Sequence, residues 1–113
     1  MPPKVFVVLV VMRLSEVAVG EDNALPVDEV TGDRTIYECL SDLVNAVGLV
    51  PNLGSLKLVD VISSEDGAVL IAYRIRTQAQ ALAGEWRWQN LGADLHGKEE
   101  RRLLDRAWEL ERP

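Results

Sequence analysis

Carboxylate and amide side chains are concentrated between residues 28 and 45, and their spacing is suited to chemistry. Glu38, Asp42 and Asn45 are spaced i, i+4, i+7, so they share one face if this segment is a helix. The preceding segment adds three carboxylates: Asp28, Glu29 and Asp33. Such a cluster of oxygen atoms can ligate a hard divalent cation such as Mg²⁺. Alternatively, a carboxyl group in an apolar cleft has its pKa raised and acts as an acid or base without a metal.

Part of this cluster also has a structural explanation. Arg34–Val47 is predicted to be a helix, since apolar residues repeat along it at helical spacing. These residues are Ile36, Leu40, Leu43, Val44 and Val47. Thr35 followed by Glu38 is a capping-box pattern, and Asp33 suits the positive end of the helix dipole. Gly48 fits the left-handed residue that ends such a helix. A solvated acidic face is therefore the alternative to a metal site.

The remaining elements predict a sheet that positions this helix. Lys4–Met12 is almost wholly apolar, which is typical of a strand buried on both faces. Ser15–Val19 is a candidate partner strand, and Gly20–Asp33 is predicted to be a long loop of the kind that is usually functional. Ser55–Ser63 and Ala68–Arg76 flank an Asp-Gly turn, so we expect them to form a hairpin.

The last third of the chain supplies one more strand and one more helix. Thr77–Gly84 is predicted to be a loop, and Glu85–Gln89 alternates as a short strand. Lys98–Glu111 is predicted to be a helix with a buried stripe formed by Leu103, Leu104, Ala107 and Trp108. The order of elements predicts an α/β fold, an α/β/α sandwich with a mixed β-sheet between two helices. At 113 residues, we expect one domain spanning 1–113.

Leu25–Leu49 resembles the signature box of the Nudix family, whose usual members cleave nucleoside diphosphates linked to another group. That box reads Gly, five residues, Glu, seven residues, then Arg-Glu-aliphatic-any-Glu-Glu-any-Gly-aliphatic. Leu43, Gly48 and Leu49 match its hydrophobic and glycine positions. The other positions of the box, in order, fall on Val27, Asp33, Ser41, Asp42, Asn45 and Ala46. The resemblance is thus to a degenerate Nudix box.

The resemblance extends along the chain in order. Leu25-Pro26 precedes the box loop, Ala72-Tyr73-Arg74 resembles the end of the hairpin, and Gly84-Glu85-Trp86 resembles a later strand. It implies the Nudix-type sandwich. In the family, the helix carboxylates bind divalent cations, usually magnesium, which bridge the diphosphate and activate water. Here Asn45 and Ala46 replace two of those carboxylates, so we expect no metal cofactor. Magnesium is expected only if hydrolysis is retained by a rebuilt site.

Composition limits the partners. The net charge of −6 and the pI near 4.7 argue against nucleic-acid binding and make an anionic substrate less natural. Val5–Met12 is too short to span a bilayer, so a cytoplasmic protein without a membrane partner is expected. Cys39 is the only cysteine, which excludes an internal disulfide, and we expect it to be partly buried in the helix.

The candidate site residues follow from these patterns. Acid–base candidates are Asp42, Glu38 and Glu29, and ligand-binding candidates are Asn45, Tyr73, Arg74, Trp86 and Trp88. No metal ligand is assigned. His96, the only histidine, is more often a cap or an exposed residue in such a position. The tryptophans are suited to stacking on a flat ligand, but a place in the core or at a homodimer interface is the favoured interpretation.

Three functions remain open. The first is a Nudix-like protein that has lost metal-dependent diphosphate hydrolysis and uses its cleft for small-molecule binding or metal-independent acid–base catalysis. The second is a Nudix hydrolase acting on a nucleoside diphosphate derivative with a rebuilt magnesium site. The third is a non-catalytic scaffold or dimeric subunit. Whether the chain is an enzyme is not decided by the sequence.

Overall fold

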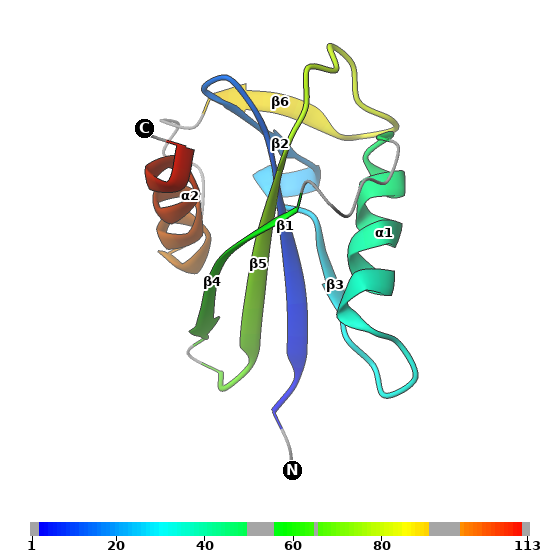
Figure 1. The fold of residues 1–113 in the computed structure, drawn as a ribbon, viewed down its shortest axis with the longest axis vertical. Helices are drawn as coiled ribbons and strands as arrows, with labels where there is room; N and C mark the ends of the chain where they lie inside the picture. Colours follow the sequence, from blue (N-terminus) through cyan, green and yellow to red (C-terminus); the bar gives the residue numbers. More distant parts are fainter. Residues whose placement is uncertain (1–2, 50–55, 65, 91–97, 112–113) are drawn as a thin grey trace.

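A mixed six-stranded sheet lies between two helices, as Figure 1 shows for the computed structural model. The structure describes residues 3–49, 56–64, 66–90 and 98–111. The strands are β1 (Val5–Arg13), β2 (Glu16–Val19), β3 (Val27–Glu29), β4 (Lys57–Ser63), β5 (Val69–Arg76) and β6 (Arg87–Asn90). The helices are α1 (Ile36–Ala46), α2 (Lys98–Glu111) and a short 3-10 helix, η1 (Glu21–Asn23). This arrangement confirms the predicted α/β/α sandwich.

Strand β1 is the centre of the sheet. The strand order is β4-β5-β1-β2-β6, and β3 also pairs with β1. The β1–β5 pair is parallel, whereas β1 pairs antiparallel with β2 and with β3. Alternate β1 side chains enter two separate cores, because successive residues of a strand point to opposite faces. Val7, Leu9 and Val11 pack toward α1, and Val8, Val10 and Met12 pack toward α2. The prediction of a strand buried on both faces is confirmed.

The predicted long loop Gly20–Asp33 is wrong in part, because it contains η1 and β3. Strand β3 pairs with the first half of β1 in the register Phe6↔Glu29, Val7↔Asp28 and Val8↔Val27. Backbone hydrogen bonds from Leu9 to Pro26 (2.9 Å) and from Val30 to Val5 (2.8 Å) continue this pairing at both ends. Three residues, two of them acidic, are too few for an alternating pattern to be recognised.

Helix α1 is slightly shorter than the predicted Arg34–Val47, but its predicted boundary residues, Thr35 and Gly48, are confirmed. The Thr35 side chain accepts a hydrogen bond from the Glu38 backbone amide at 3.1 Å, which is the capping contact. Its buried face comprises Cys39, Leu40, Leu43, Val44 and Val47. Cys39 is fully buried rather than partly buried. Gly48 has a φ of 92°, the left-handed conformation expected at the end of the helix.

Helix α2 covers the other face of the sheet. Leu103, Leu104 and Ala107 are buried against Val59 and Ile62 of β4 and neighbouring strands. Trp108 was predicted to belong to this stripe, but 36% of its surface is exposed. The α2 residues that are buried in the core on this side are therefore Leu103, Leu104 and Ala107. Within the described ranges, no helix is long and apolar enough to cross a membrane.

Gly48→Ala is expected to destabilise the protein by about 2 kcal/mol or more, because a left-handed alanine is strained and its Cβ would lie 2.8 Å from Ala83 Cβ and 2.9 Å from Ala83 N. Urea denaturation measures the change. Gly32→Ala is the control, since a Cβ at Gly32 meets nothing within 4 Å. Equal unfolding midpoints for the two variants would contradict this account of the helix end.

Candidate functional site

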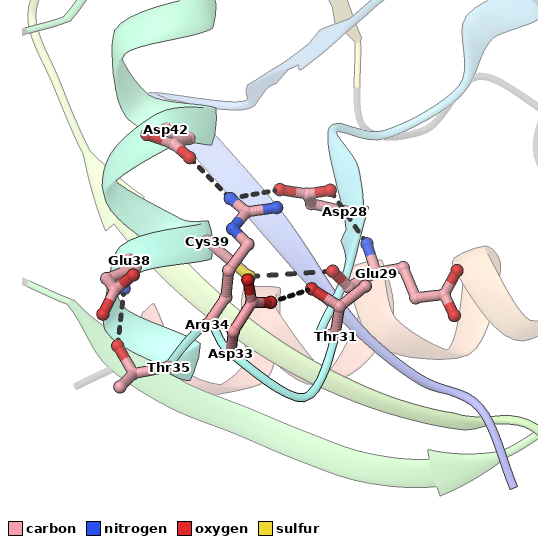
Figure 2. Close-up of polar contacts among 9 residues, drawn as sticks. All are labelled: Asp28, Glu29, Thr31, Asp33, Arg34, Thr35, Glu38, Cys39 and Asp42. Atoms are coloured by element: carbon pink, nitrogen blue, oxygen red, sulfur yellow. Dashed lines mark hydrogen bonds and ion pairs between the residues drawn. The ribbon is translucent and has the colours of Figure 1, made fainter.

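Strand β3, the turn before α1 and helix α1 bring Asp28, Arg34 and Asp42 together (Figure 2). Arg34 Nη2 lies 2.9 Å from Asp28 Oδ2 and 2.5 Å from Asp42 Oδ2. A single guanidinium nitrogen therefore contacts both carboxylates. We call these three residues the Arg34 bridge. It joins β3 to α1 across the region that resembles a degenerate Nudix box.

The pairing of β3 determines which acidic residue joins the bridge. Asp28 lies opposite Val7 and faces α1, whereas Glu29 lies opposite Phe6 and faces the other side of the sheet. Figure 2 shows the Glu29 side chain directed away from Arg34 and Asp42. Asp28 Oδ1 also accepts a hydrogen bond from the Glu29 backbone amide at 2.9 Å. Glu29 and Asp42, two of the predicted acid–base residues, are therefore not brought together.

The turn before α1 directs Arg34 back toward β3. The Arg34 amide donates to the Thr31 carbonyl at 3.1 Å, and the Thr31 hydroxyl donates to Asp33 Oδ1 at 3.2 Å. Asp33 is used locally in this turn and takes no part in the bridge (Figure 2). Thr35 then caps the helix. Of the six residues predicted to offer oxygen ligands, only Asp28 and Asp42 converge on one point.

The electrostatics of the bridge favour fixed charges over proton transfer. The hydrogen bond to Asp28 raises the pKa of the Arg34 guanidinium above its ordinary value, and the charges of Asp28 and Asp42 act in the same direction. Asp42 has 66% of its side chain exposed. Asp42 therefore lies in solvent beside a guanidinium and not in the apolar cleft that the acid–base hypothesis requires. Glu38 and Asn45 are likewise exposed on α1.

These residues do not fit a magnesium ion. Among the described residues, no group of three His, Cys, Asp or Glu side chains is placed to hold a metal ion. The two carboxylates that converge are already bonded to Arg34, and Ala46 offers a methyl group where the resemblance places a carboxylate. To bind these two carboxylates, Mg²⁺ would have to displace the Arg34 guanidinium from both of them.

A cleft of about 380 Å³ adjoins the bridge. Val27, which precedes Asp28 in β3, lines this cleft. Ala46, one turn beyond Asp42 in α1, lines it as well. The complete lining is Gly20, Glu21, Ala24, Leu25, Val27, Ala46, Gly84, Glu85 and Trp86. No basic side chain occurs among these described lining residues. The described lining is therefore mostly apolar, and its only charged side chains are Glu21 and Glu85.

The Trp86 ring forms a fixed wall of the cleft. It packs so closely over Gly20 that a Cβ there would lie 2.8 Å from Trp86 Cζ3. Arg87 holds the same turn, because it donates to the Gly20 carbonyl at 2.9 Å and to the Asn23 side chain. Trp88 points to the same face of the sheet, but the Arg13 guanidinium lies 4.5 Å from its ring centroid. Of the two predicted tryptophans, Trp86 is the one that lines the cleft.

A larger hollow of about 700 Å³ lies at the carboxyl ends of β1 and β5. Its lining is Arg13, Leu14, Arg76, Thr77, Gln78 and Gln80. Arg13 is committed to structure there, since it donates to the Ala79 carbonyl at 2.9 Å and to Glu16 at 2.7 Å. We therefore regard the smaller cleft beside α1 as the better candidate for a ligand site.

The other predicted residues lie elsewhere. Tyr73 packs on the α1 side of β5, and Arg74 lies opposite Val10 and faces α2, so the two do not form one surface. His96 lies outside the described residues. Arg34, Glu21 and Glu85 were not predicted as site residues. Arg34 carried a signal, since it is the only basic residue between Arg13 and Lys57.

Cys39 is expected to react slowly with thiol reagents in the folded protein. Burial raises the pKa of its thiol, and its surface is fully enclosed. Because this pKa is raised, the neutral Cys39 thiol stabilises the folded state fully at a pH below the ordinary thiol pKa. That contribution to the free energy of unfolding is lost as the pH rises through the folded-state pKa. We expect the reaction with DTNB at pH 8 to be roughly 100-fold slower than in 8 M urea. Comparable rates would show that Cys39 is accessible.

Comparison with known proteins identifies the fold. No family model and no curated protein matches the sequence. Among solved structures, the NUDIX domain of Shewanella oneidensis NrtR, complexed with ADP ribose, has a TM-score of 0.77 at 14% identity, over 97% of this chain and 89% of that chain. A putative nudix hydrolase family member from Chromobacterium violaceum has a TM-score of 0.76 at 17% identity, over 98% of this chain and 80% of that chain.

A third structure shows the same fold within a longer chain. The MutT/nudix family protein from Enterococcus faecalis has a TM-score of 0.70 at 16% identity, over 80% of this chain. This chain spans only 44% of that protein's length. Identities this low establish the fold alone. The protein has a Nudix fold, as the resemblance of Leu25–Leu49 implied.

Proposed function

We propose that this protein binds a small molecule in the cleft beside α1 and does not carry out metal-dependent diphosphate hydrolysis. The observation that carries the proposal is the lining of that cleft. Glu21 and Glu85 supply negative charge, Trp86 supplies an aromatic wall, and Val27 and Ala46 supply an apolar surface. An aromatic wall, an apolar side and a few polar groups are the usual composition of a small-molecule site.

The charge of the cleft disfavours a diphosphate. A diphosphate carries several negative charges, and it would meet two carboxylates without a Lys, Arg or His among the described lining residues. The protein as a whole has a net charge of −6, so its long-range field also repels anions. A bound cation normally offsets such repulsion, but the residues of the Arg34 bridge do not fit one.

The same composition favours a flat ligand that is cationic or neutral. A cation can lie against the face of Trp86, which attracts positive charge, while Glu21 and Glu85 accept its hydrogen bonds. The NUDIX domain of NrtR, which is similar in fold, is complexed with ADP ribose, and this supports the use of such a fold to bind a small molecule. Glu29 faces away from Asp42, and Asp42 is exposed beside Arg34, which together favour binding over acid–base catalysis.

Hydrolysis is tested directly with ADP-ribose. We expect no AMP above the uncatalysed background when the protein is incubated with ADP-ribose and Mg²⁺ or Mn²⁺, because the cation has no protein ligand set and the cleft repels the substrate. Chromatographic separation of AMP measures the reaction. AMP that accumulates in proportion to enzyme, requires the metal and is lost in Asp42→Asn would refute the proposal and favour a rebuilt hydrolase site.

Three matched probes test the ligand class. Benzamidine, benzamide and benzoate have the same shape and are cationic, neutral and anionic at neutral pH. We expect binding strength to fall in that order in ligand-observed NMR titrations. Glu85→Gln is expected to reduce the preference for benzamidine over benzamide roughly threefold to tenfold. Trp86→Leu is expected to weaken all three probes, since it removes the aromatic wall.

Trp108→Leu is the matched control, because Trp108 lies on α2 and does not line the cleft. It is expected to leave all three titrations unchanged. Benzamide binding as tightly as benzamidine would contradict the charge preference but leave a binding cleft. Tightest binding of benzoate, or equal losses in Trp86→Leu and Trp108→Leu, would contradict the proposed site itself.

A further inference from the structure

We propose that Arg34 takes the place of a divalent cation at the junction of β3 and α1, so that a permanent internal charge holds the two elements together. The inference rests on one part of the proposed function, namely that the protein works without a metal. It concerns the architecture of the site and does not depend on which ligand the cleft binds.

The geometry is that of two carboxylates converging on one positive centre. Asp28 Oδ2 and Asp42 Oδ2 come from different elements, yet both contact Arg34 Nη2, at 2.9 and 2.5 Å (Figure 2). A divalent cation bridges carboxylate oxygens at about 2.0–2.6 Å, so the same pair could span one after a small movement. The guanidinium nitrogen occupies the point at which such a cation would sit.

The sequence around the bridge makes Arg34 indispensable to its charge balance. Arg34 is the only basic residue between Arg13 and Lys57, a stretch that also contains Asp28, Asp33, Glu38 and Asp42. Without Arg34, Asp28 and Asp42 would repel each other across the junction. Such a pair would become a place where a cation lowers the free energy, with water completing its coordination, as Mg²⁺ commonly retains several waters.

The position of the bridge gives it a role in the cleft. Val27 of β3 and Ala46 of α1 both line the cleft, and each lies close in the chain to a bridge carboxylate. Holding Asp28 and Asp42 on one guanidinium therefore fixes the spacing between β3 and α1 where the cleft opens. Because Arg34 is part of the chain, it holds this spacing whatever the concentration of free magnesium.

Mn²⁺ binding, measured by electron paramagnetic resonance at constant ionic strength, tests the inference. We expect the wild type to show no saturable site that Asp42→Asn removes. Arg34→Met, which keeps an unbranched apolar stem but removes the charge, is expected to bind Mn²⁺ at least roughly tenfold more tightly than the wild type. The added site should disappear in the double variant Arg34→Met/Asp42→Asn. Mn²⁺ should also raise the thermal midpoint of Arg34→Met alone.

Arg106→Met is the matched control, since Arg106 forms an exposed ion pair with Glu109 on α2 at 3.3 Å. It should gain no Mn²⁺ affinity. A wild-type site that is lost in Asp42→Asn would overturn the inference even if Arg34→Met failed to fold. Arg34→Met binding Mn²⁺ no better than Arg106→Met would also overturn it. Neither result depends on benzamidine or ADP-ribose, so the ligand proposal stands or falls separately.

Discussion

The burial of β1 on both faces is the constraint on which the rest of the structure depends. Its alternating side chains supply the centre of two cores, so each face requires its own helix. Its two edges are occupied as well, by β5 on one side and by β2 and β3 on the other. The register of β3 against β1 then determines where along α1 the Asp28 side chain lies. The candidate site is a consequence of how this one strand is enclosed.

Most of the fold could be predicted because its signals are local. The apolar run of β1, the helical repeat of α1 and the Asp-Gly turn between β4 and β5 each lie within a few residues. Strand β3 could not be predicted, since its identity depends on hydrogen bonds to β1 and not on its own three residues. Trp108 was misplaced because periodicity indicates a face of a helix but not where the covering sheet ends.

The candidate site was less predictable than the fold, for a related reason. Helical spacing placed Asp42 on one face of α1, where its side chain is exposed, but its partners come from outside the helix. Arg34 reaches it from the preceding turn, and Asp28 from β3. The cleft likewise combines Glu21, Ala46 and Glu85, which no local pattern relates. Sequence spacing can show which residues share a face, whereas it cannot show which faces meet.

The parallel pairing of β1 with β5 has a consequence for how this protein folds. Val5 pairs with Val69 and Met12 with Arg76, so the central contact of the sheet joins distant parts of the chain. Closing such a long loop is entropically costly before any pairing repays it, which slows folding. During synthesis, the most apolar segment leaves the ribosome long before its main partner exists. Until β5 is made, β1 can pair only with β2 and β3, so one edge of this apolar strand stays open to association with other chains.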